Sequence, residues 1–109
     1  MRVLLKVSIP THVGNERVID GSLARTIETI LDDINPETVY FAEEQGARTG
    51  FIFCNIRNES EIPAISEPWF RALNARVELH PAMTLADLKK AAPGFAEAVK
   101  KYSYIPKAA

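Results

Sequence analysis

Short apolar runs and longer amphipathic stretches alternate along the chain in the order β-α-β-β-α-β. The short runs alternate in polarity as a half-buried strand does, most clearly at Val3, Leu5, Val7 and Ile9. The longer stretches repeat apolar residues every three or four positions, as expected of a helix packed on one side. The pattern predicts strands at 2–9, 38–44, 48–56 and 75–83, and helices at 15–34 and 61–73.

Local signals refine the two helices. Asn15 is a plausible N-cap for the first, and Gly21 weakens that helix locally. In the second, Pro68 lacks an N–H and crowds the preceding turn. We therefore expect either a kink at Pro68 or a helix that begins near Ser66.

A C-terminal helical segment follows the last strand. Thr84 and Asp87 resemble a capping box, and Pro93-Gly94 is expected to interrupt the helix that they start. The segment 84–102 can pack on its own subunit or cross to a partner. We expect residues 1–109 to form a single domain whose tail is loose from about residue 104.

This element order predicts an α+β fold: a ferredoxin-like βαββαβ sandwich with a four-stranded antiparallel sheet. The expected spatial order of strands is fourth, first, third, second. Both helices should cover one sheet face, and strand 48–56 is assigned to them through Ile52, Cys54 and Ile56. The other face would then expose Leu4, Lys6, Ser8, Tyr40, Phe51, Phe53, Asn55, Glu78 and His80. That face is too apolar to stay in water, which predicts a homodimer formed through it.

Composition narrows the partners. Thirteen basic residues nearly balance fourteen acidic ones, so no electrostatic field favours nucleic acid or an anionic membrane. No apolar run is long enough to span a bilayer. The single cysteine excludes an internal disulfide, and we expect a cytoplasmic location.

His80 and Glu78 are the candidate catalytic residues. They lie two apart on one strand and point the same way, with Lys6 expected on the neighbouring strand. A histidine beside a carboxylate and an amine can transfer protons, because its pKa lies near neutral pH. The same three residues can equally form a polar ion-pair network at a dimer interface, which needs no chemistry.

Ligand-binding candidates are drawn from the same face and from two further elements. They are Lys6, His12, Tyr40, Phe53, Phe70 and His80. His12 is placed in a loop after the first strand, where ligands are often met, and Phe70 can face a pocket or a second subunit. Cys54 is interpreted as a small core residue. We expect no metal site and no cofactor, because neither metal-ligand spacing nor a nucleotide motif is present.

Three stretches carry a resemblance to a known group. KVSIP-x-H-x-G-N, RTGFIF and EPWFRALNARVELHPAMT resemble small stand-alone bacterial proteins of unassigned function, which are similar to the dimeric α/β barrel superfamily with ferredoxin-like topology. The resemblance implies a homodimer whose two sheets face each other. That superfamily holds cofactor-independent monooxygenases, isomerases, haem enzymes and proteins without a known reaction, so the resemblance assigns no catalytic residue.

Two functions stay open on the sequence. One is a binding or interaction module that holds a small organic ligand or another protein. The alternative is a small cofactor-independent enzyme, monooxygenase-like or isomerase-like, with His80 as acid/base, Glu78 orienting it, and Tyr40 and Phe53 as pocket walls.

Overall fold

A computed structural model of the chain describes residues 1–104 and 106. Four strands form one antiparallel sheet in the order β2-β3-β1-β4, as the sequence predicts. The central strands are β1, with Val3, Val7 and Ile9 on one face, and β3, with large apolar residues on both faces; β2 and β4 are the edges. Pro81 is tolerated in β4 because an edge strand can spare a ladder donor. The strands are β1 (Arg2–Ile9), β2 (Thr38–Glu44), β3 (Ala47–Asn55) and β4 (Arg76–Ala82).

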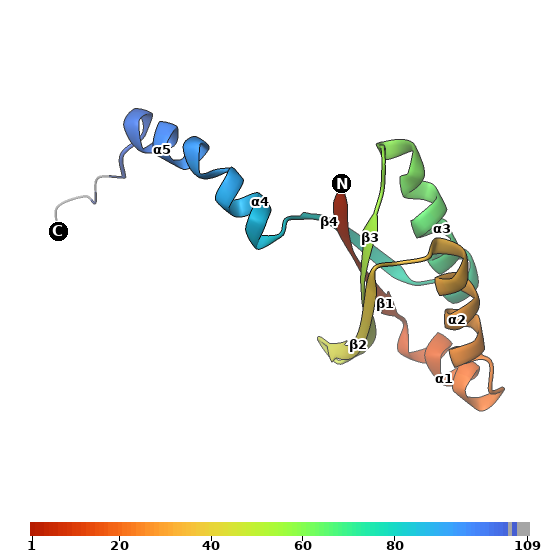
Figure 1. The fold of residues 1–109 in the computed structure, drawn as a ribbon. Helices are drawn as coiled ribbons and strands as arrows, with labels where there is room; N and C mark the ends of the chain where they lie inside the picture. The colour runs from red at the N-terminus through yellow and green to blue at the C-terminus, as the bar shows by residue number, and fades with distance from the viewer. Residues whose placement is uncertain (105, 107–109) are drawn as a thin grey trace.

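Three helices cover one face of this sheet, and the chain has a ferredoxin-like βαββαβ fold with additional C-terminal helices (Figure 1). The covering helices are α1 (Thr11–Ile19), α2 (Leu23–Ile34) and α3 (Ile62–Leu73), the last preceded by a short 3-10 turn at Glu59–Glu61. A further pair, α4 (Leu85–Lys90) and α5 (Ala92–Lys101), follows β4.

The hydrophobic core lies between the sheet and these three helices. Leu5 and Ile52 from the central strands are fully buried against Trp69 and Leu73 of α3. Cys54 also faces this side, which confirms the predicted orientation of β3. Since the alternation of β1 sends every second residue into this layer, the intervening residues must lie on the opposite face.

The predicted helix over 15–34 is in fact two helices. The chain reverses between them at Gly21, whose φ of 76° favours a residue without a side chain. The first helix begins earlier than predicted, directly after Pro10, whose carbonyl accepts a hydrogen bond from the Gly14 N–H at 2.9 Å. Asn15 is therefore not an N-cap. It lies within α1, and its side chain accepts a hydrogen bond from Arg48 of β3 at 3.0 Å.

Pro68 does not delay the start of the second helix. α3 begins at Ile62 with Pro63 in its first turn and continues past Pro68 to Leu73. A helix interior loses one hydrogen bond at a proline. Burial of Trp69 and Leu73 against the sheet offsets that loss, because large apolar side chains gain more from burial than one bond contributes.

The C-terminal helices form an arm that leaves the sheet. Figure 1 shows α4 and α5 projecting away on the side opposite α1, α2 and α3. Every residue from Met83 to Tyr104 is exposed. The radius of gyration is 18.8 Å, against about 13 Å for a compact domain of this length. The apolar side chains of the arm are therefore not buried against the rest of their own chain.

The predicted details of the arm are largely confirmed. Thr84 and Asp87 form a reciprocal capping box at the start of α4. The interruption lies at Ala91, two residues before the predicted Pro93, because Pro93 is accommodated in the first turn of α5. The expected loose tail falls mostly on residues 105 and 107–109, which lie outside the described residues.

Candidate functional site

The uncovered face of the sheet brings most of the predicted site residues together. Two adjacent rows of side chains cross all four strands on this face, and strand pairing fixes their order. The first row runs Tyr40, Phe51, Lys6, Glu78, and the second runs Thr38, Phe53, Leu4, His80. Throughout, we call this surface the open face.

Lys6 lies at the centre of the open face and is held by two carboxylates. Its Nζ is 2.7 Å from Oε2 of Glu44 and 2.9 Å from Oε2 of Glu78. These hydrogen bonds, the one to Glu44 first, raise the pKa of Lys6 above its ordinary value. Lys6 is thus a protonated amine that neutralises acidic neighbours, and it is not suited to act as a base at neutral pH.

Glu78 is engaged by Lys6. The hydrogen bond from Lys6 lowers the pKa of Glu78, and its other carboxylate oxygen lies 3.9 Å from Nη2 of Arg76. His80 is exposed and pairs across the strands with Leu4, next to Phe53. Within residues 1–104 and 106 no hydrogen bond joins Glu78 to His80. The carboxylate predicted to orient the histidine therefore serves the lysine instead.

Aromatic side chains form the apolar half of the open face. Phe51, Phe53 and Leu4 are half-buried by their strand neighbours, and Tyr40 on the edge strand is 68% exposed. They form one continuous strip, because adjacent strands lie about 4.8 Å apart. The strip can contact the apolar part of a ligand or a second protein surface.

Two predicted ligand residues lie away from the open face. His12 is exposed in the first turn of α1, so the predicted loop position was wrong. Phe70 lies on α3 and is 42% exposed. Both belong to the helical layer on the other side of the sheet (Figure 1), where they cannot share a site with His80 and Tyr40.

Cys54 has the character of a core residue. It faces the helices and is 2% exposed. Burial raises the pKa of its thiol, with the charge of Glu37 adding to the shift. A thiol held protonated in this way is a poor nucleophile.

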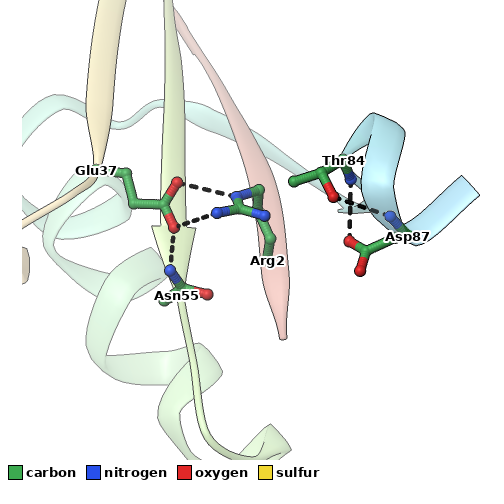
Figure 2. Close-up of polar contacts among 5 residues, drawn as sticks. All are labelled: Arg2, Glu37, Asn55, Thr84 and Asp87. Carbon is green, nitrogen blue, oxygen red and sulfur yellow. Dashed lines mark hydrogen bonds and ion pairs between the residues drawn. The ribbon is translucent and has the colours of Figure 1, made fainter. Parts of the chain in front are cut away.

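A polar cluster closes one end of the open face, where the arm departs (Figure 2). Nε and Nη2 of Arg2 donate to the two carboxylate oxygens of Glu37 at 2.9 and 3.0 Å, and Asn55 also donates to Glu37. Thr84 and Asp87 cap α4 beside this cluster. The bidentate pair joins β1 to the start of β2 and fixes the end of the face geometrically.

An apolar groove lies between α2 and the edge strand β2, and it was not predicted from the sequence. We call it the α2–β2 groove. Phe41 faces the helical side of the sheet from β2, yet it is 57% exposed. Leu23, Ile27 and Leu31 of α2 line the groove opposite Phe41, and the volume is about 450 Å³. The ring of Phe41 occupies the space over Gly50, which has no side chain. The alternation of Val39 and Phe41 in 38–44 was the signal that could have revealed it.

In the part of the chain that the structure describes, no group of three or more histidine, cysteine or acidic side chains converges as a metal site would require. No helix in that part is both long and apolar enough to cross a bilayer.

Comparison of the chain with protein-family models and with curated protein sequences finds no match.

Proposed function

We propose that the protein is a homodimeric binding module of the dimeric α/β barrel type, in which two open faces pack against each other. The observation that carries this proposal is the uncovered strip of Leu4, Phe51, Phe53 and Tyr40. Contiguous apolar surface of this kind marks an interaction site. A second copy is the simplest partner, because a two-fold axis pairs the same patch with itself.

The charges on the open face are compatible with burial. Lys6 already pairs with Glu44 and Glu78 inside one chain, at 2.7 and 2.9 Å. An ion pair that is complete before association leaves no unpaired charge to be desolvated, whereas an isolated charge would oppose association strongly. The central lysine therefore supports the interface model.

The proposed ligand is a small apolar or carboxylated organic molecule held between the two sheets. Tyr40 and Phe53 offer aromatic surface, and the exposed His80 offers a polar group in the same two rows. Pockets that combine apolar walls with a few polar groups are typical of small-molecule sites. His12 and Phe70 drop out of this proposal, because they lie on the helical side.

The enzyme alternative has weaker support. It requires His80 as acid/base with Glu78 to orient the imidazole, but the Glu78 carboxylate bonds to Lys6 at 2.9 Å. A general base normally needs a second group that fixes its tautomer and direction. Binding without chemistry is therefore the function that the geometry supports better.

The dimer is tested by changing one exposed residue on each side of the sheet. Tyr40→Asp places a charge in the proposed interface without touching the core, and it should weaken the dimer about 30-fold or more. Phe70→Asp on α3 is the matched control and should leave association unchanged. Sedimentation equilibrium across micromolar concentrations measures both. A wild-type protein that stays monomeric throughout would refute the proposal.

The ligand is tested separately with His80→Ala. A thermal-shift screen of small aromatic and carboxylic acids is run on wild type and variant, with sedimentation in parallel. If the open faces enclose a ligand site, His80→Ala should reduce the shift given by a hit while the dimer persists. Loss of the dimer with no hit in either protein would instead indicate an interface without a ligand. If neither quantity changed, His80 would have neither role.

A further inference from the structure

The arm consists of two consecutive helices, α4 and α5, whose large apolar side chains have no cover. Leu85 and Leu88 lie three positions apart in α4, Phe95 and Val99 lie four apart in α5, and Tyr102 directly follows α5. We call these five exposed residues the stripe. Phe95 is 56% exposed and Val99 is 73% exposed. A helix of this kind is stable in water mainly when the stripe packs on another surface. The arm therefore needs a partner that its own chain does not supply.

The α2–β2 groove has the complementary character. It is apolar along Leu23, Ile27, Leu31 and Phe41, and its rim carries the acidic side chains Glu28 and Asp32. Among the described residues, no basic side chain lines the groove beside these two carboxylates, whereas the arm from 84 to 104 has four lysines against two carboxylates. The arm and the groove thus match in both hydrophobicity and charge sign.

The lysines of the arm are placed to use this match. Lys89 and Lys100 directly follow Leu88 and Val99, so they flank the apolar stripe. With the stripe seated against Phe41, a flanking lysine could reach the acidic rim of α2. Contacts of this kind at the rim of an apolar interface set orientation more than affinity.

The arm and the groove of one chain lie at opposite edges of its sheet. The arm begins after β4, and the groove adjoins β2, which is the opposite edge of the sheet. The arm also projects on the side away from α2 (Figure 1). When two open faces meet around a two-fold axis that runs along the strands, β4 of one copy lies opposite β2 of the other. The arm of one copy then departs beside the β2 edge of its partner, and the partner's groove lies around that edge on the helical side.

We propose that the arm formed by α4 and α5 of one copy docks in the α2–β2 groove of a second copy. This exchange of arms rests on the proposed homodimer, and it adds a second contact on each side of the two-fold axis. The apolar stripe from Leu85 to Tyr102 covers Phe41 and the exposed side of α2, and the arm passes around the free edge of β2.

Disulfide trapping between full-length chains tests the docking. One chain carries Ala24→Cys in the groove, and the other, labelled with ¹⁵N, carries Ala98→Cys in the arm. Both replaced alanines are exposed, and native Cys54 is buried. Docking should raise the effective concentration of the pair from about 10 µM to about 1 mM, so the mixed disulfide should form roughly a hundredfold faster than between undocked chains. Intact mass spectrometry identifies it.

Two matched combinations exclude other positions of the arm. Thr38→Cys replaces Ala24→Cys to report an arm lying on the partner's open face, since Thr38 is exposed there. A single chain with both Ala24→Cys and Ala98→Cys reports an arm folded back on its own groove. A dominant Thr38–Ala98 disulfide, or an intramolecular disulfide in the double variant, would overturn the proposal.

Sedimentation of the same samples separates this proposal from the homodimer. A dimer that forms without the Ala24–Ala98 disulfide overturns arm exchange and leaves the open-face dimer standing. A monomer at all concentrations overturns both. A dimer that yields the mixed disulfide at the docked rate supports both.

Discussion

The two faces of the sheet differ although the same strands build them. Leu5 points to the helices and is fully buried, whereas its neighbour Leu4 points to the open face and is only half-buried. The helical face is completed by Trp69 and Leu73 of the same chain. The open face has comparable apolar residues and no such cover. The comparison shows that a single chain buries the apolar residues on the helical face of the sheet but leaves those on the open face uncovered.

The arm repeats this contrast at the level of helices. The stripe of α3 is buried, while the stripe of α4 and α5 is exposed throughout. Within the described residues, the open face also carries no unpaired charge at its centre, because Lys6 is neutralised by Glu44 and Glu78 of its own chain. The open face and the arm can therefore be buried against a protein surface. We expect substitutions there to act differently from substitutions in the core between the sheet and its helices.

The largest loss of stability is expected from a substitution in the core between the sheet and its helices. Leu5→Ala should lower the free energy of unfolding by about 2–5 kcal/mol, because it leaves a cavity between the sheet and α3. Urea denaturation at several protein concentrations measures it. The loss should be the same at every concentration, since the contact lies within one chain. A neutral result would mean that the core does not pack as described.

Leu4→Ala should give a smaller loss that depends on concentration. Leu4 contributes to a layer completed only by association, so its truncation should lower Tm mainly at the protein concentrations where the dimer forms. The pair Leu4 and Leu5 is thus an internal comparison at adjacent positions. An equal loss at all concentrations would place Leu4 in the core of the single chain and weaken the interface model.

The ion pairs of the open face predict a modest pH dependence. Lys6 lowers the pKa of Glu78, so ionised Glu78 adds stability above the ordinary carboxyl value of 4.5, and this is lost as the pH falls through the lowered pKa. Glu78→Gln should flatten the acid limb of stability against pH. The raised pKa of Lys6 acts in the opposite range: its contribution is present below 10.5 and lost as the pH rises through the raised value.

Urea melts from pH 3 to pH 7 measure the acid limb on wild type and Glu78→Gln. Glu59→Gln is the control, because Glu59 is exposed and lies outside the ion-pair cluster. An acid limb that is identical in wild type and Glu78→Gln would show that the Lys6–Glu78 pair adds nothing to folding.

The smallest effect is expected in the arm. Thr84→Ala removes one half of the capping box and should destabilise α4 by about 1 kcal/mol. Because the arm adds nothing to the core, global unfolding of the single chain should be unchanged. Hydrogen exchange should be faster only in amides of α4. Slower global refolding or a lower Tm in dilute protein would indicate that the arm contacts its own sheet.

Much of the fold followed from the sequence because alternation in strands is a local signal. The parity of β1 correctly assigned Leu5 to the core and Lys6 to the open face. The sequence analysis treated Gly21 as a weak point within one helix, whereas the structure has a turn there. A glycine is compatible with both, and only its positive φ in the structure distinguishes the turn. Pro68 was overestimated, since burial of Trp69 decides the helix there.

The site was predictable only where strand register determined it. Lys6, Glu78 and His80 were placed on one face from parity, and register confirms that placement. The partner of Glu78 was not predictable, because parity places both Lys6 and His80 on its face of the sheet and side-chain geometry chooses between them. The groove at Phe41 was missed because it depends on how far α2 extends over β2, which no local pattern encodes.

The most direct test of the central claim is whether the open face itself becomes covered when copies associate. Thr38→Cys places a thiol on that face, and Ile19→Cys, on α1, provides a control thiol that is exposed on the helical side. Alkylation rates are measured from submicromolar to high micromolar protein. The account predicts that Thr38→Cys is protected in proportion to the fraction of dimer, while Ile19→Cys reacts at one rate throughout. A dimer in which Thr38→Cys stays fully reactive would contradict it.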